Sequence, residues 1–351
     1  MLKLKRLKKG DRVAIVSLSK GMLGEEKFIH ILDIARARLE GDYSLEVTVM
    51  PNTLKGISWL YDHPEARAED LMNAFIDKSV KAVICAIGGD DTIRLLPYID
   101  FDVIRNNPKI FMGFSDTTVN HFMMYKAGLV SYYGGSLMCN WGEYVEINPY
   151  TKSAFDRAFF EPTSRFDILP AGFECFDDDQ KIRWIKENSG IIRERRPDPK
   201  GYEVLQGSGK VSGRLLGGCV ESFVDVIGTS LWPDLDEWRG KILFIETSDS
   251  EQGNEYPESL FVWILRNLVA QGILNEISGI IMGKPPLRKK YDDYKQLLLD
   301  VVSVEAGMRD IPIFYNVNFG HAYPIGIIPY GLMCELNCEK KNITVLEALT
   351  N

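Results

Sequence analysis

Histidine is scarce in this chain, basic residues are outnumbered by acidic ones, and closely spaced cysteine pairs and long apolar runs are missing. Among 351 residues there are four histidines and six cysteines, and the net charge is −8. The negative balance argues against nucleic acid or an anionic membrane surface as the main partner. No apolar run approaches the ~18 residues that cross a bilayer, so we expect no membrane partner.

The cysteines are scattered and form no Cys-x-x-Cys pair. Cys334 and Cys338 have no histidine or second cysteine pair nearby to complete a zinc site. The basic start of the chain (3–12) precedes an apolar run (13–18) that is too short for a signal peptide. We therefore expect a cytoplasmic protein with reduced thiols, no metal and no cofactor.

Strand and helix patterns alternate through the first third of the chain, which predicts a parallel sheet covered by helices. Ligands of such sheets collect at the carboxyl ends of the strands. The expected strands lie near 13–18, 45–50, 80–87 and 109–112, and the expected helices near 28–39, 64–76, 93–99 and 118–125.

The regular pattern is lost after Tyr150 and resumes at Val211. The expected later strands are 241–246, 277–282, 313–317, 333–338 and 343–346, with helices at 257–271 and 291–305. We expect an N-terminal α/β domain over 1–160, an interdomain crossing with an exposed loop over 161–210, and a C-terminal domain over 211–351. Trp184 is the one tryptophan of the crossing, and either a ligand lid or packing onto a neighbouring surface would explain it.

A serine lies between an expected strand and an expected helix, in the segment 111–118 (FMGFSDTT). Such a turn lifts a serine clear of the sheet, and the first amides of the helix lie beside it, placed to stabilise an anion. Thr117 stands where a Gly-x-Ser-x-Gly elbow has its second glycine. The segment alone predicts either a nucleophile at Ser115 or a helix cap at Ser115 or Asp116.

One of the four histidines, His321, follows an expected strand in a glycine-flanked loop, where a general base would be needed. Glu246 ends another expected strand. A serine hydroxyl needs a base within hydrogen-bond reach, and a carboxylate that holds this base in one tautomer. Ser115, Glu246 and His321 are therefore a candidate triad; a solvated acid and a structural loop histidine are the alternative.

The turn 88–92 (GGDDT) follows an expected strand and supports a different chemistry. It resembles the phosphate loop of phosphofructokinases and related kinases, in which glycine amides approach phosphate and an aspartate helps to hold magnesium. The chain has no second acidic cluster resembling the phosphofructokinase base motif and no arginine set for a sugar phosphate. The same turn could instead form an oxyanion hole, with a glycine amide aimed at the carbonyl that Ser115 attacks.

Together these segments resemble the S66 serine peptidases, which comprise the LD-carboxypeptidases and the microcin C7 self-immunity proteins. The resemblance extends along the whole chain. Its segments are Gly88-Gly89 with 94–100 (RLLPYID), 113–118 (GFSDTT), 213–218 (GRLLGG), 245–248 (IETS), 265–274 (LRNLVAQGIL) and 319–321 (FGH).

The resemblance implies a Ser–His–Glu hydrolase with Ser115 as nucleophile, His321 as base and Glu246 as the residue that orients it. It implies an oxyanion hole made of the backbone amides of Asp116 and Gly89. It also implies an N-terminal α/β domain that carries the serine, a smaller C-terminal α/β domain that carries the other two residues, an active site between them, and a homodimer.

The segments 246–248 (ETS) and 265–274 (LRNLVAQGIL), with the long loop that carries Trp184, resemble the microcin-immunity branch more than the LD-carboxypeptidases. Two departures from the LD-carboxypeptidases also bear on the substrate. Cys219 stands where LD-carboxypeptidases tend to have the asparagine of Gly-Gly-Asn, and 87–91 (IGGDD) replaces their Arg-Gly-Gly-Tyr-Gly. In the immunity branch a loop tryptophan stacks on the base of an aminoacyl-adenylate-like substrate, and the enzyme cuts the bond between the aminoacyl group and a phosphoramidate or sulfamate. We therefore expect Trp184 and Asp90 to bind substrate.

The implied function is a hydrolase that forms an acyl-enzyme at Ser115 and acts on a small peptide or an aminoacyl-nucleotide, such as processed microcin C7. A murein tetrapeptide LD-carboxypeptidase is the close alternative. A magnesium-dependent kinase that uses the turn 88–92 is a distant alternative, and a protein that sequesters an adenylate without turnover is a third.

Overall fold

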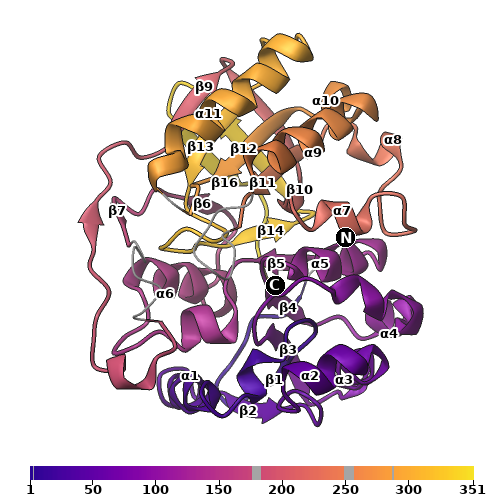
Figure 1. Cartoon of the computed structure of the whole chain (residues 1–351), viewed down its shortest axis with the longest axis vertical. Helices are drawn as coiled ribbons and strands as arrows, with labels where there is room; N and C mark the ends of the chain where they lie inside the picture. Colours follow the sequence, from indigo (N-terminus) through magenta and orange to yellow (C-terminus); the bar gives the residue numbers. More distant parts are fainter. Residues whose placement is uncertain (3, 176–182, 249–256, 287) are drawn as a thin grey trace.

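The computed structural model describes all residues except 3, 176–182, 249–256 and 287, and the described residues form two main sheets (Figure 1). The first sheet has six strands. In spatial order they are β14 (Ile328–Tyr330), β5 (Ser131–Tyr133), β4 (Ile110–Gly113), β3 (Val80–Cys85), β1 (Arg12–Val16) and β2 (Glu46–Val49). Strands β1 to β5 are parallel and β14 is antiparallel to β5.

The helices of the first half are α1 (Ile29–Gly41), α2 (Ile57–Asp62), α3 (Pro64–Ile76), α4 (Phe101–Asn106), α5 (Thr117–Lys126) and α6 (Pro149–Phe155). Helix α3 begins at a proline, which favours the first helical position, and it buries Ala68, Leu71 and Phe75 on one side. The helix predicted near 93–99 is a 3-10 helix over Thr92–Tyr98, with Pro97 inside it. Proline has no N–H to donate, which disfavours a longer α-helix there.

The second sheet has eight strands. In spatial order they are β6 (Phe166–Ile168), β16 (Asn342–Val345), β15 (Met333–Asn337), β10 (Lys210–Cys219), β11 (Ile242–Glu246), β12 (Gly279–Gly283), β13 (Ile313–Val317) and β9 (Glu203–Gln206). Strands β10 to β13 are parallel, and the outer strands join them antiparallel. Its helices are α7 (Phe223–Val226), α8 (Leu235–Trp238), α9 (Glu258–Ala270), α10 (Ile273–Glu276) and α11 (Tyr291–Leu299).

The two halves exchange segments. The predicted crossing, 161–210, supplies β6 and β9 to opposite edges of the second sheet, and the short ribbon of β7 (Phe173–Glu174) and β8 (Arg196–Pro197). Residues 176–182 of this crossing, including its three successive aspartates, lie outside the described residues. Late in the chain β14 returns to the first sheet, so strands from both ends of the sequence build it.

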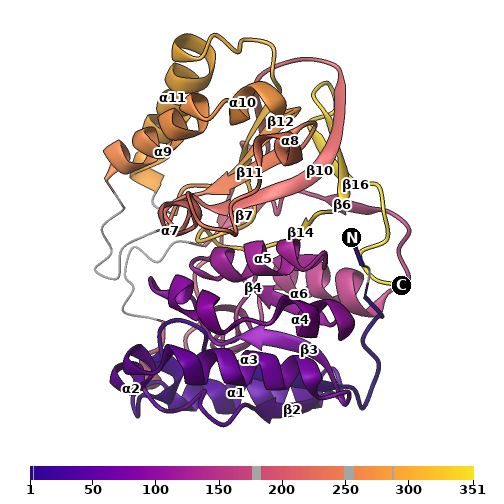
Figure 2. The same cartoon turned by 90° about the vertical axis from the view of Figure 1, so that its right-hand side faces the viewer.

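The mixed α/β architecture confirms the predicted fold class. Figures 1 and 2 show the first half below, the second half above, and α5 with β14 where they meet. Three strands carry the candidate site residues to this junction. β4 leads to Ser115, β11 ends in Glu246 and β13 leads to His321. Within the described segments, every helix is too short or too polar to cross a membrane.

Candidate active site

Ser115 lies at the sharp turn between β4 and α5. Its φ of 66° is in the left-handed region, which is uncommon for a residue with a side chain and is a mark of functional turns. Gly88 lies against it: a Cβ atom at position 88 would be 2.7 Å from the Cβ of Ser115. The turn that follows β3 can therefore approach the serine closely only because it carries glycine here.

His321 joins Ser115 to Glu246. Its Nε2 is 3.0 Å from Ser115 Oγ, and its Nδ1 is 2.8 Å from one carboxylate oxygen of Glu246. Glu246 is fully buried and, as an acceptor only, favours the tautomer that carries the proton on Nδ1. Nε2 is then left as the acceptor for the serine hydroxyl, so the structure brings the three predicted residues into one hydrogen-bonded chain.

A glycine lets the histidine loop reach the carboxylate. Gly320 has a φ of 81°, and a Cβ atom there would lie 2.5 Å from the carboxyl carbon of Glu246. This close approach allows the backbone N–H of His321 to donate to Glu246 Oε2 at 3.2 Å. Glu246 thus holds both the ring and the backbone of His321.

Tyr133, at the end of β5, is a member of the site that the sequence patterns missed. Its hydroxyl donates to Glu246 Oε1 at 2.5 Å and accepts the backbone N–H of Ser115 at 3.1 Å. Burial, with the neighbouring charge of Glu246, raises the pKa of Tyr133 well above its usual value, so it stays a phenol. The Tyr133 hydroxyl therefore links the turn that holds Ser115 to Glu246. No local sequence motif predicted this contact.

The carboxylate of Asp116 organises the turn 88–92. Its Oδ2 accepts the amide N–H of Asp91 at 3.1 Å and that of Thr92 at 2.9 Å, and the hydroxyls of Ser19 and Thr92. Burial raises the pKa of Asp116, and these hydrogen bonds oppose the increase. The predicted oxyanion amides, of Asp116 and Gly89, thus belong to two turns that one side chain ties together.

The side chains of the kinase-like turn have other partners. Asp91 pairs with Arg67 at 2.7 Å and with Arg94 at 3.1 Å. Asp90 is exposed at the same turn, and its predicted contact with substrate stays a prediction. An aspartate held by two arginines is poorly placed to hold magnesium, which leaves Asp90 as the residue of this turn that a kinase would have to use.

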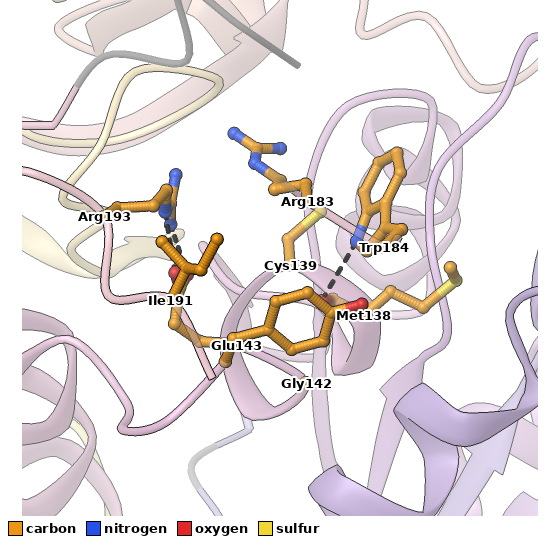
Figure 3. A pocket seen from close by; sticks show the side chains of 9 residues that line it. Met138, Cys139, Gly142, Glu143, Arg183, Trp184, Ile191 and Arg193 are labelled. Atoms are coloured by element: carbon orange, nitrogen blue, oxygen red, sulfur yellow. Dashed lines mark hydrogen bonds and ion pairs between the residues drawn. The ribbon is translucent and has the colours of Figure 1, made fainter. Parts of the chain in front are cut away.

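Trp184 lines a small pocket together with Arg183 and Arg193 (Figure 3). Its indole N–H donates to the carbonyl of Met138 at 3.4 Å, and its ring meets Phe28 edge-on. The guanidinium groups of Arg183 and Arg193 lie 4.2 and 3.8 Å from the ring centre of Tyr323, two residues beyond His321. The tryptophan therefore packs onto a neighbouring surface here, and its stacking on a base stays a prediction.

His121 is buried below the serine and outside the hydrogen-bonded chain. Its ring nitrogens lie 2.9 Å from the carbonyl of Gly113 and 2.7 Å from the hydroxyl of Ser131. Burial lowers its pKa to about 4, so the ring is neutral near pH 7. It supports the end of β4 and leaves the role of base to His321.

A serine at a strand-to-helix turn, hydrogen-bonded to a histidine that a buried carboxylate orients, is the arrangement found in serine hydrolases. Two family models match the chain: the LD-carboxypeptidase N-terminal domain over residues 13–134 and the LD-carboxypeptidase C-terminal domain over 212–336. The chain belongs to the S66 peptidase family.

Individual relatives fall on both branches of this family. The microcin C7 self-immunity protein MccF of Escherichia coli is 30% identical over 80% of this chain and 78% of its own length. A probable murein peptide carboxypeptidase of Bacillus subtilis is 29% identical over 99% of this chain and 94% of its own. The crystal structure of an MccF-like protein from Streptococcus pneumoniae in complex with AMP is 36% identical, with a TM-score of 0.86 over 96% of this chain and 98% of the other.

Proposed function

We propose that the chain is a serine hydrolase that cleaves an aminoacyl- or peptidyl-nucleotide through an acyl-enzyme at Ser115. The observation that carries the proposal is the 3.0 Å separation between Ser115 Oγ and His321 Nε2, with Nδ1 of the same ring on the buried Glu246. In this mechanism His321 takes the hydroxyl proton as Ser115 attacks the acyl carbonyl. It then gives the proton to the leaving group. In the second half of the reaction His321 takes a proton from a water molecule, which attacks the acyl-enzyme and releases the carboxylic acid.

The oxyanion of the tetrahedral intermediate would be held by the amides of Asp116 and Gly89. The Ser115 amide is occupied by Tyr133, and it is therefore a poor candidate for this role. The Asp116 amide lies at the start of α5, where the helix dipole favours negative charge. Preorganised donors of this kind each contribute roughly 10²–10³-fold to the rate.

The nucleotide part of the substrate is proposed from two observations. The MccF-like protein from Streptococcus pneumoniae, 36% identical to this chain, was crystallised with AMP. In this chain Trp184 and Arg193 line a pocket beside the loop that carries His321. An indole ring can stack on a base, a contact of ~1–3 kcal/mol.

A murein tetrapeptide is the second candidate substrate, because the Bacillus subtilis relative that aligns along nearly the whole chain is named a probable murein peptide carboxypeptidase. The same mechanism would then release the terminal residue of the peptide. We further propose a cytoplasmic homodimer. None of the six cysteines, all of which the structure describes, forms a disulfide, as expected in a reducing compartment, and the family resemblance supports the dimer.

The decisive experiment offers the purified protein an aminoacyl sulfamoyl-adenosine and a murein L,D-tetrapeptide side by side, and measures kcat/KM for each. We expect the nucleotide to be cleaved faster and an acyl adduct on Ser115 to be detectable by mass spectrometry. Faster cleavage of the tetrapeptide would make the murein function the right one. Tight binding of the adenosine compound with no turnover of either substrate would contradict hydrolysis.

A further inference from the structure

A thiol lies beside the hydrogen-bonded chain and takes no part in the proposed mechanism. Cys219 ends β10 and is in register with Glu246, the last residue of the parallel neighbour β11. The Cys219 sulfur, a carboxylate oxygen of Glu246 and a ring nitrogen of His321 all lie within 4.8 Å of one another. We call these three residues the thiol cluster.

The ligand types of the thiol cluster select among metals. A thiolate with an imidazole and a carboxylate is a ligand set for Zn²⁺, whereas Mg²⁺ and Ca²⁺ prefer oxygen ligands alone. Ligand atoms around one tetrahedral Zn²⁺ lie about 3.5 Å apart, so small side-chain shifts would gather the three. Glu221 is close enough to assist, because its Oε2 accepts the thiol hydrogen of Cys219 at 2.9 Å.

We propose that the thiol cluster is an inhibitory Zn²⁺ site, at which the metal and catalysis compete for His321. On binding, the S–H bond of Cys219 breaks, the sulfur lone pair goes to the metal, and the proton passes to Glu221 or to solvent. The side chain of His321 is 13% exposed while that of Glu246 is fully buried, so the ion would enter past the histidine ring.

Inhibition follows from the electron pairs of the imidazole. A neutral ring has one N–H and one lone pair. Once the lone pair is on the metal, whichever nitrogen supplies it, none remains to accept the Ser115 proton. This loss of activity rests on the proposed function; the binding of metal does not.

Two measurements test the proposal separately. Hydrolysis of the aminoacyl sulfamoyl-adenosine is followed while buffered Zn²⁺ is raised and then removed with a chelator. Cd²⁺ is added to the resting protein, and its thiolate absorption band in the ultraviolet is recorded, which needs no activity. We expect reversible inhibition, and one Cd²⁺–thiolate band per chain.

The variants Cys219→Ala and Cys219→Asn should abolish the band and raise the inhibition constant for Zn²⁺ at least about 100-fold. Cys338→Ala, one residue beyond the end of β15, is the matched control and should keep both effects. Equal inhibition of the Cys219 variants, or a band that survives in them, would overturn the proposal. The absence of both inhibition and band from the unmodified protein would also overturn it. If the protein shows the Cd²⁺ band but hydrolyses nothing even in metal-free buffer, only the proposed function is contradicted.

Discussion

The candidate triad and the segment that carries Trp184 are built in different ways. Ser115, Glu246 and His321 lie at or just beyond the ends of parallel strands from two sheets. Residues 183–198, which we call the Trp184 arm, contain one 3-10 turn and the two-residue strand β8. Strand ends fix positions through sheet hydrogen bonds, whereas an irregular arm depends on its side chains.

Those side chains are charged. Arg193 pairs with Glu143 through two nitrogens, and Arg195 with Glu146. The buried Lys284, directly after β12, donates to Asp198 at 2.6 Å and to Glu174 at 3.2 Å. Under the proposed function, chemistry that tolerates sub-ångström errors poorly lies at strand ends, and recognition lies on an irregular arm that ion pairs fasten to both halves of the chain.

The largest effect should come from the nucleophile. Replacing Ser115 with Ala should lower kcat about 10⁴-fold or more, because no other group can form the acyl-enzyme. Circular dichroism and the melting temperature should change little. Ser222→Ala is the matched control, since its hydroxyl only donates to the Ser115 carbonyl at 3.4 Å. Activity of Ser115→Ala comparable to that of the control would remove the triad from the mechanism.

Tyr133→Phe should have the next largest effect. It deletes the donor to Glu246 and the acceptor of the Ser115 amide while keeping the ring that packs in the core. Losing a hydrogen bond to a charged group costs ~1.5–3 kcal/mol, so kcat should fall roughly 10–100-fold with little change in KM. Tyr132→Phe is the control, because its hydroxyl bonds the remote carbonyl of Leu349. A change confined to KM would assign Tyr133 to substrate binding.

Trp184→Ala probes the arm. If the indole stacks on a base, KM for the aminoacyl sulfamoyl-adenosine should rise by the equivalent of ~1–3 kcal/mol, roughly 5- to 150-fold, while kcat changes less. Trp263→Ala, on the exposed side of α9, should leave KM unchanged. An equal KM in both variants would mean that Trp184 only packs against Phe28, and the comparison between a catalytic centre and a recognition arm would lose its second half.

The sequence predicted the triad better than its surroundings. Ser115 and His321 come after buried strands and Glu246 ends one, and period and turn residues mark such positions locally. Tyr133 and Cys219 lie next to Glu246 because strands far apart in the sequence come together in the fold. Local hydrophobic periodicity and turn motifs do not predict such contacts. For the same reason β6 and β9, inside the predicted crossing, and β14 could be assigned to their sheets only from the structure.

Changes at His121 should have the smallest effect on activity. They should instead change how the free energy of unfolding depends on pH. The pKa of His121 is about 4 in the folded protein and about 6.5 when unfolded, so between these pH values the unfolded chain binds more protons. Stability should therefore rise from pH 4 to 6.5 and be lost as the pH falls, by about 2 kcal/mol at pH 5 from this group.

His121→Gln, which can keep a donor toward Gly113, should remove that dependence. Burial raises the pKa of Asp70 to about 6, which gives a slope of opposite sign, but this slope is common to both proteins and cancels in their difference. Urea unfolding at pH 5 and 7.5 should thus show a change in unfolding free energy that differs by about 2 kcal/mol between the two proteins. Identical pH dependence of the unfolding free energy in the two proteins would mean that His121 takes up protons in the folded state. The interior beneath the Ser115 turn would then be open to solvent.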